Sequence, residues 1–81
     1  MRLATLDLGT NTVRLLVADV APDRAGWRVV EHDQRVTRLG EGLADRGVLG
    51  EAAMARTEAV VLDYVARARR AGAERVQVVA T

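Results

Sequence analysis

Residues suited to binding chemistry gather in one short stretch near the amino terminus, where Asp7 precedes Gly9-Thr10-Asn11-Thr12. A carboxylate at the end of a buried strand can hold a magnesium ion through water. Glycine lets the backbone approach a phosphate, and the amides that follow can donate to it. In a plain turn, Asp7 and Asn11 would only cap local amides. Because a turn alone needs neither the buried aspartate nor so many hydroxyls, the pattern favours a phosphate or metal site.

A second polar stretch, Arg38-Leu39-Gly40-Glu41-Gly42, places an arginine and a glutamate around two glycines. The planar fork of arginine suits phosphate oxygens, and glycine permits a close approach of the backbone. Taken alone, the stretch is more typical of an ordinary loop with a solvated ion pair. Its interpretation as part of a site therefore depends on where the fold places it.

For the other charged side chains, a position on the solvated surface is either the favoured interpretation or one of two. Arg14 follows the first stretch, and its guanidinium either reaches the site or decorates the surface. His32, the one histidine, lies in the middle of a polar strand, where a solvated edge residue is a better interpretation than a catalytic base. Arg67, Arg69 and Arg70 are typical of a solvated helix end, with contact to a neighbouring subunit as the alternative.

Four strands and one helix are expected to position these residues. Three apolar runs separated by polar turns predict an antiparallel meander, and the charged third run is typical of a sheet edge. A glycine-rich loop is expected at residues 40–50. The expected strands are residues 3–8, 13–20, 27 to about 38 and 75–81, and the expected helix is residues 51–71.

One face of this helix is predicted to pack on the sheet, because apolar side chains recur with the helical period. Gly72 provides a left-handed exit at its end. The expected core stripe consists of Met54, Thr57, Val61, Val65 and Ala68. The expected solvent face consists of Arg56, Asp63, Arg67 and Arg70.

The connection through the helix decides the topology. A helical crossover returns the chain to a strand parallel to the first, almost always with a right-handed path. We therefore expect an α/β fold with the strand order three, two, one, four. The carboxyl ends of the first, third and fourth strands then share one rim, where open α/β sheets hold ligands. Residues 7–12, residues 38–42 and Thr81 all lie at that rim.

Composition excludes several classes of function. The 12 basic residues are offset by 11 acidic ones, and Trp27 and Tyr64 are the only aromatic residues, so a nucleic-acid surface is not expected. The absence of cysteine excludes disulfides and thiolate metal sites. No apolar run approaches the roughly 20 residues of a membrane span, and no signal peptide is recognisable. We expect a cytoplasmic protein that binds neither nucleic acid nor membranes.

The stretch LDLGTNT resembles the first phosphate loop of the superfamily of actin, sugar kinases and heat-shock chaperones. The ribonuclease-H-like domains of that superfamily begin with three antiparallel strands, a helix and a parallel strand. A narrower resemblance, over essentially the whole chain, is to the exopolyphosphatase and guanosine pentaphosphate phosphohydrolase family, Ppx/GppA. It rests on DLGTNTVRLLVADV, TRLGEGLADRGVLGEAAMART and ERVQVVAT, in that order and spacing.

This resemblance implies that Asp7 contacts the metal ion, that Arg38 is a substrate-side arginine, and that Thr81 begins a second phosphate-binding stretch, ATS. The first phosphate loop would consist of Gly9, Thr10, Asn11 and Thr12. Enzymes of this family use magnesium and a glutamate base to direct water at a terminal phosphoryl group of polyphosphate or pppGpp. The resemblance also implies a homodimer.

The catalytic glutamate and the second glycine-rich loop of the family are expected beyond residue 81. Residues 1–81 are therefore predicted to be the truncated amino-terminal portion of the first actin-like domain, inactive alone and either prone to associate through its last strand or poorly folded. Two alternatives stay open. One is a sugar- or acetate-type kinase of the same superfamily, against which the sequence RLGEGL argues, and the other is a non-catalytic phosphate- or nucleotide-sensing module.

Overall fold

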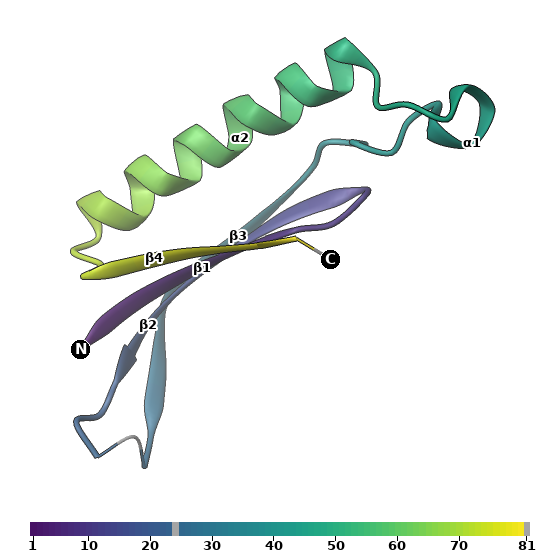
Figure 1. Cartoon of the computed structure of the whole chain (residues 1–81). Helices are drawn as coiled ribbons and strands as arrows, with labels where there is room; N and C mark the ends of the chain where they lie inside the picture. The colour runs from purple at the N-terminus through teal and green to yellow at the C-terminus, as the bar shows by residue number, and fades with distance from the viewer. Residues whose placement is uncertain (24, 81) are drawn as a thin grey trace.

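The computed structural model describes residues 1–23 and 25–80, which form a four-stranded sheet with one long helix across one face (Figure 1). The predicted α/β class is confirmed. In chain order the elements are β1 (Arg2–Leu8), β2 (Thr12–Val20), β3 (Trp27–Val36), α1 (Leu43–Arg46), α2 (Glu51–Arg70) and β4 (Arg75–Ala80).

The sheet has the predicted strand order, β3-β2-β1-β4. β2 pairs antiparallel with both β1 and β3, whereas β4 pairs parallel with β1 after the crossover through α2. Leu6, at the centre of β1, lies opposite Leu15 of β2 and Val78 of β4. Because β1, β3 and β4 run in the same direction, their carboxyl ends meet at one end of the sheet, as predicted.

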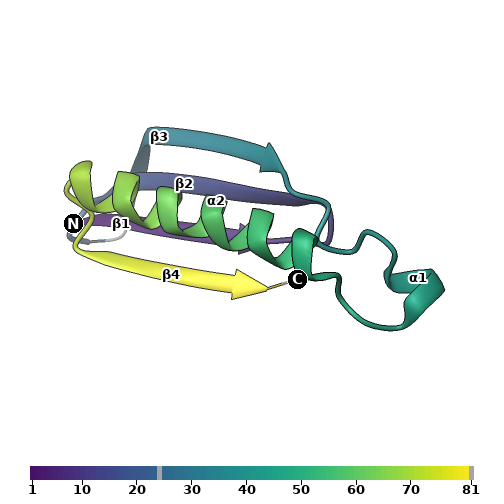
Figure 2. The ribbon, with the colours of Figure 1, turned by 90° about the horizontal axis from the view of Figure 1, so that it is seen from above.

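The core lies between α2 and the face of the sheet that this helix covers (Figure 2). Alternate residues of β1 and β2 point toward the helix, which is why every second apolar side chain is buried. The largest buried side chain is Tyr64 of α2. The core cluster consists of Ala4, Leu6, Val13, Leu15, Val17, Tyr64 and Ala68.

The predicted core stripe of α2 is wrong at one position. Met54 is 43% exposed, whereas Ala53, Thr57, Tyr64 and Ala68 are buried. The buried positions recur at spacings of four and seven residues that start from Ala53, so the buried face of the helix is turned slightly from the predicted stripe, with which it shares Thr57 and Ala68. This rotation follows from the docking of Tyr64 on the sheet, which the periodicity of the helix alone does not reveal.

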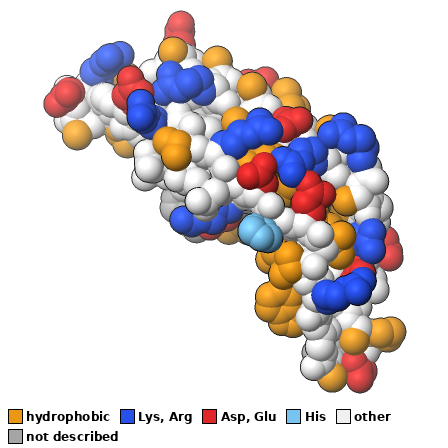
Figure 3. All heavy atoms as spheres, turned by 180° about the vertical axis from the view of Figure 1, so that it is seen from behind, with side chains coloured by type: hydrophobic (Ala, Val, Ile, Leu, Met, Phe, Trp, Pro, Cys, Tyr) orange, Lys and Arg blue, Asp and Glu red, His pale blue; other side chains and the backbone are white. Residues whose placement is uncertain are grey.

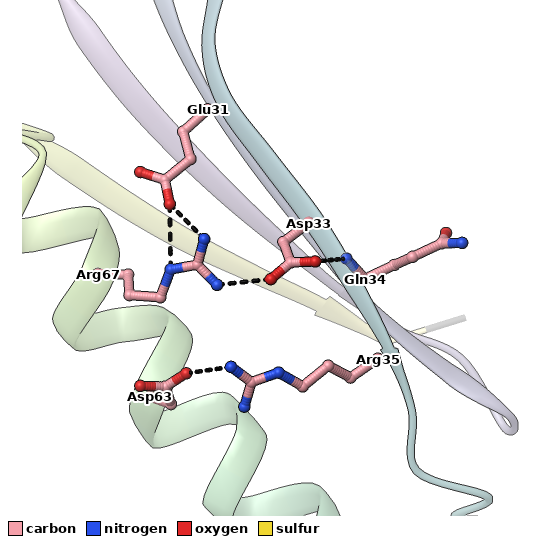
Figure 4. A network of polar contacts seen from close by, with 6 residues as sticks. All are labelled: Glu31, Asp33, Gln34, Arg35, Asp63 and Arg67. Atoms are coloured by element: carbon pink, nitrogen blue, oxygen red, sulfur yellow. Dashed lines mark hydrogen bonds and ion pairs between the residues drawn. The ribbon is translucent and has the colours of Figure 1, made fainter.

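The predicted solvent face of α2 is also partly wrong. Arg67 donates hydrogen bonds to Glu31 and Asp33 of β3, and Asp63 pairs with Arg35 at 2.8 Å (Figure 4). The cause lies in β3, where alternate residues face the helix and happen to be charged. These ion pairs close the side of the core that apolar side chains leave open.

A short helix, α1, interrupts the predicted loop at residues 40–50. It lies between two glycines in the left-handed region, Gly42 with φ 76° and Gly47 with φ 72°, a backbone conformation that glycine adopts without steric cost. β3 ends at Val36, two residues before the predicted end near Arg38. Gly72, with φ 87°, confirms the predicted exit from α2.

Figure 3 shows the molecule from behind, where positive and negative side chains alternate across the surface. This mixture agrees with the formal net charge of +1. Neither described helix combines the length and the hydropathy that a membrane span requires.

Candidate functional site

The first candidate stretch closes the hairpin between β1 and β2. The Gly9 amide donates to the Thr12 carbonyl at 3.0 Å, which leaves Thr10 and Asn11 at the tip of the turn. Both tip residues are exposed, and Gly9 and Thr12 are half-buried. The β-hairpin therefore presents two short polar side chains beyond the end of the sheet.

The second candidate stretch lies directly beside this tip. The amides of Thr37 and Arg38 both donate to the Asn11 carbonyl, at 2.9 and 3.1 Å, and the Gly40 amide donates to the Thr10 carbonyl at 2.8 Å. Three backbone hydrogen bonds thus join two segments that are far apart in the sequence. The predicted meeting of the two stretches at one rim is observed.

Gly40 eases this close approach. A Cβ atom at Gly40 would lie 3.3 Å from the Thr10 Cβ and 3.4 Å from the Thr10 carbonyl oxygen, which is tighter than an ordinary van der Waals contact. The glycine therefore allows the two backbones to touch. The contact of phosphate with this glycine that the sequence suggests stays a prediction.

Arg38 adopts an unusual backbone conformation. Its φ is 52°, and among the described residues other than glycine it is the one with positive φ. A side chain with a Cβ atom is disfavoured there, and residues held in this way cluster at binding and catalytic sites. The carbonyl of Arg38 accepts a hydrogen bond of 3.0 Å from the Glu41 amide, which closes a tight turn. The backbone that carries the exposed Arg38 side chain is thus held in place by this turn.

An open hollow lies between the two stretches. It is lined by Thr10, Asn11, Arg38, Gly40 and Glu41, together with the first residues of α1. A second hollow is lined by residues 9–12 and Arg14. The exposed tip residues Thr10 and Asn11 therefore border both hollows.

Asp7 is half-buried near the end of β1 and lies opposite Arg14 in the register with β2. A single carboxylate of this kind can supply one oxygen ligand to Mg²⁺, an ion that keeps several waters and takes further ligands from substrate phosphates. Among residues 1–23 and 25–80 there is no cluster of three or more histidine, cysteine, aspartate or glutamate side chains.

Arg14 and His32 lie on the face of the sheet that α2 does not cover. The Arg14 Nε donates to the Gln34 side chain at 3.3 Å, across the β2–β3 pair. Arg14 also borders the second hollow, so both interpretations of its function remain compatible with its position. His32 is exposed on the edge strand, opposite Leu16 and away from the hairpin tip, as expected of a solvated residue.

One residue of this region was missed by sequence reasoning. Arg56 of α2 reaches back to the second stretch, where it contacts Thr37 and Glu41. Its spacing from the core stripe predicts only that Arg56 lies on the solvent face of the helix. Thr81, the third predicted rim residue, lies outside the described residues.

Comparisons with known proteins agree with this arrangement. No protein-family model matches the chain. Exopolyphosphatase 2 of Mycobacterium tuberculosis, in each of two strains, is 40% identical over 82 residues, which cover 99% of this chain and 26% of that protein. This chain thus spans about a quarter of the length of the curated relatives that it matches.

Solved structures give the same result. The Ppx/GppA family member of Aquifex aeolicus matches with a TM-score of 0.90 and 31% identity, over 99% of this chain and 26% of that one. An exopolyphosphatase from Cytophaga hutchinsonii matches with a TM-score of 0.87 and 25% identity, over 99% of this chain and 25% of that one. The expected resemblance to the Ppx/GppA family is thereby confirmed over essentially the whole chain, in both sequence and fold.

Proposed function

We propose that this chain is the amino-terminal, phosphate-binding part of a hydrolase that releases terminal orthophosphate from inorganic polyphosphate or pppGpp. Similarity to exopolyphosphatases supports the class of reaction. The observation that carries the proposal is that the backbone and the side chains of Thr10 and Asn11 have different functions. Their backbone carbonyls hold the neighbouring segment, while their side chains stay exposed at the hollow beside Arg38.

Phosphoryl transfer depends mainly on positioning and on electrostatic stabilisation of the charge that spreads over phosphate oxygens. A rigid hairpin tip with short polar side chains and an adjacent arginine can supply both. The guanidinium of Arg38 can donate two parallel hydrogen bonds to a phosphate. In this proposal the phosphate-binding residues are Gly9, Thr10, Asn11, Thr12, Arg38 and Thr81.

Asp7 is proposed to hold Mg²⁺, which would neutralise charge on the phosphate oxygens when bound. The base that activates water is assigned to a glutamate outside residues 1–81, following the resemblance to the family. The complete enzyme is proposed to be a cytoplasmic homodimer whose substrate is neither a nucleic acid nor a membrane component.

The direct test measures orthophosphate released by the complete protein from polyphosphate and from pppGpp, with and without Mg²⁺. Metal-dependent release from either substrate supports the proposal, and the ratio between the two identifies the preferred one. Release from neither substrate, with transfer of phosphate from ATP to a sugar or to acetate, would show a kinase instead. Tight binding of polyphosphate without release would show a sensing module.

Arg38 has a separate test, because its proposed function is to hold a substrate phosphate. In the complete enzyme, Arg38→Ala should raise KM for polyphosphate more than it lowers kcat. It should also make binding less sensitive to salt, since one fewer cation contacts the anion. Arg70→Ala, at an exposed position on α2, is the matched control. An unchanged salt dependence in Arg38→Ala would assign Arg38 to a solvated loop.

A further inference from the structure

Arg56, on the second turn of α2, contacts both ends of the segment that contains Arg38. Its Nε donates to the Thr37 carbonyl oxygen at 3.1 Å, and its Nη2 donates to the Glu41 Oε2 at 3.0 Å. One guanidinium thus bridges two acceptors four residues apart. Arg38 lies between those two acceptors.

The opposite side of this segment is fixed on the hairpin tip by the three backbone hydrogen bonds to Thr10 and Asn11. The segment is therefore held between two elements, the β1–β2 turn and α2. Thr37 is only 2% exposed, and the hydrogen bond that its carbonyl accepts from Arg56 is partly buried. Removal of Arg56 would take away both of its bonds to the segment, which is therefore expected to be held less firmly.

The backbone of Arg38 makes this support necessary. A φ of 52° is disfavoured for any residue with a Cβ atom, and it persists where surrounding contacts hold it. Arg56 supplies two of these contacts from outside the hollow. It does not belong to the residues that line the hollow beside the hairpin tip.

We propose that Arg56 is a positioning residue, which fixes the segment Thr37–Glu41 so that the Arg38 guanidinium and the hairpin tip face the same substrate phosphate. This inference rests on the proposed function. Arginine suits this function better than lysine, because its planar fork places donors on separate nitrogens, whereas lysine offers one compact ammonium.

The first experiment measures kcat and KM for polyphosphate in the complete enzyme. Arg56→Ala is expected to raise KM by roughly tenfold, because a displaced binding group loses much of its contribution, with a smaller change in kcat. In the Arg38→Ala background, the same change should raise KM less than about twofold, since residues that act through one another are non-additive. Arg69→Ala, exposed on the same helix, is the control and should leave KM unchanged.

Full additivity of the Arg56 and Arg38 substitutions would overturn the proposal, because Arg56 would then act independently of Arg38. Arg56→Lys covers the case in which the alanine variant fails to fold. It keeps the charge and most of the side chain, and we expect it to recover less than half of the lost affinity. Complete recovery of KM by lysine would also contradict the bridging function.

The second experiment needs no substrate. Hydrogen–deuterium exchange should become roughly tenfold faster at the Arg38 and Gly40 amides in Arg56→Ala, whereas the core amide of Leu15 should keep its protection. Unchanged exchange at both loop amides would overturn the proposal. If the complete protein does not hydrolyse or bind polyphosphate, the proposed function fails. The exchange result still decides whether Arg56 holds the segment.

Discussion

The polar contacts made near the first turns of α2 differ from those made near its last turns. Near its first turns, the segment Thr37–Glu41 is joined to the β1–β2 turn by backbone hydrogen bonds, and the side chains of Thr10 and Asn11 stay exposed. Near its last turns, side chains make the contacts, as in the bonds from Arg67 to Glu31 and Asp33 (Figure 4). The first arrangement leaves polar side chains exposed, and the second pairs charged side chains with one another.

The side-chain contacts at the far end form a compact network around Tyr64. The guanidinium groups of Arg35 and Arg67 lie 5.2 and 5.4 Å from the centre of the Tyr64 ring, within reach of a cation–π interaction. The hydrogen bond from Arg67 holds the pKa of Asp33 below its ordinary value. Burial raises the pKa of the Tyr64 hydroxyl. Both guanidinium groups are thus engaged in packing the helix on the sheet, Arg67 through Glu31 and Asp33 and Arg35 through Asp63.

The largest effect expected from this comparison concerns catalysis. Asn11→Ala in the complete enzyme should reduce orthophosphate release by about 10²–10³-fold, which is the usual cost of removing one preorganised donor. The melting temperature should change little, because the backbone carbonyl that accepts from Thr37 and Arg38 is kept. Asp7→Ala should also reduce the rate, through loss of a metal contact.

His32→Ala is the control for this prediction, since His32 is exposed away from the hairpin tip. It should leave phosphate release unchanged. If Asn11→Ala kept wild-type turnover at saturating Mg²⁺, the turn would be a plain hairpin. The exposed side chains at its tip would then have no function in binding phosphate.

A smaller effect, on stability, is expected at the other end. Arg67→Ala removes the hydrogen bonds to Glu31 and Asp33 and exposes one face of Tyr64, so the melting temperature should fall by about 3–8 °C. At 25 °C the KM for polyphosphate should stay close to the wild-type value. Calorimetry of Arg67→Ala beside Arg69→Ala measures the effect. A raised KM in Arg67→Ala, with normal stability, would show that the two ends are coupled.

The parts of this picture that the sequence predicts are those set by local patterns. Alternating apolar residues specify β1 and β2, and the crossover rule then gives the strand order. The residue types of Asp7 to Thr12 mark the hairpin tip as unusual. By contrast, the contact of Arg56 with the loop and the exposure of Met54 depend on how α2 is rotated on the sheet. That rotation is a tertiary property, set by the fit of Tyr64 into the core, and no spacing along the helix encodes it.

The smallest expected effect concerns acid stability at the far end of α2. Arg2 donates to both carboxylate oxygens of Asp19, at 2.8 and 3.0 Å, and to the Ala71 carbonyl at 2.6 Å, so it ties β1, β2 and the helix end together. The hydrogen bond from Arg2 lowers the pKa of Asp19 from 3.8 to about 2. A carboxyl whose pKa is depressed by folding stabilises the folded state above its ordinary pKa, and this contribution is lost as the pH falls through the lowered value.

The wild-type protein should therefore lose stability between about pH 4 and pH 2, and Asp19→Asn should lose less over that range while starting from a lower value at pH 7. The difference in slope should be modest, because both side chains are about one-third exposed and water screens the pair. Asp33, whose pKa is also lowered, should make stability depend on pH in the variant as well.

Urea midpoints measured from pH 7 to pH 2 test the difference between Asp19→Asn and the wild type, with Asp45→Asn, an exposed carboxyl on α1, as the control. Equal slopes for Asp19→Asn and the wild type would mean that the Arg2–Asp19 pair is solvated. Of the ion pairs near the last turns of α2, those of Arg67 would then be the ones that stabilise the fold.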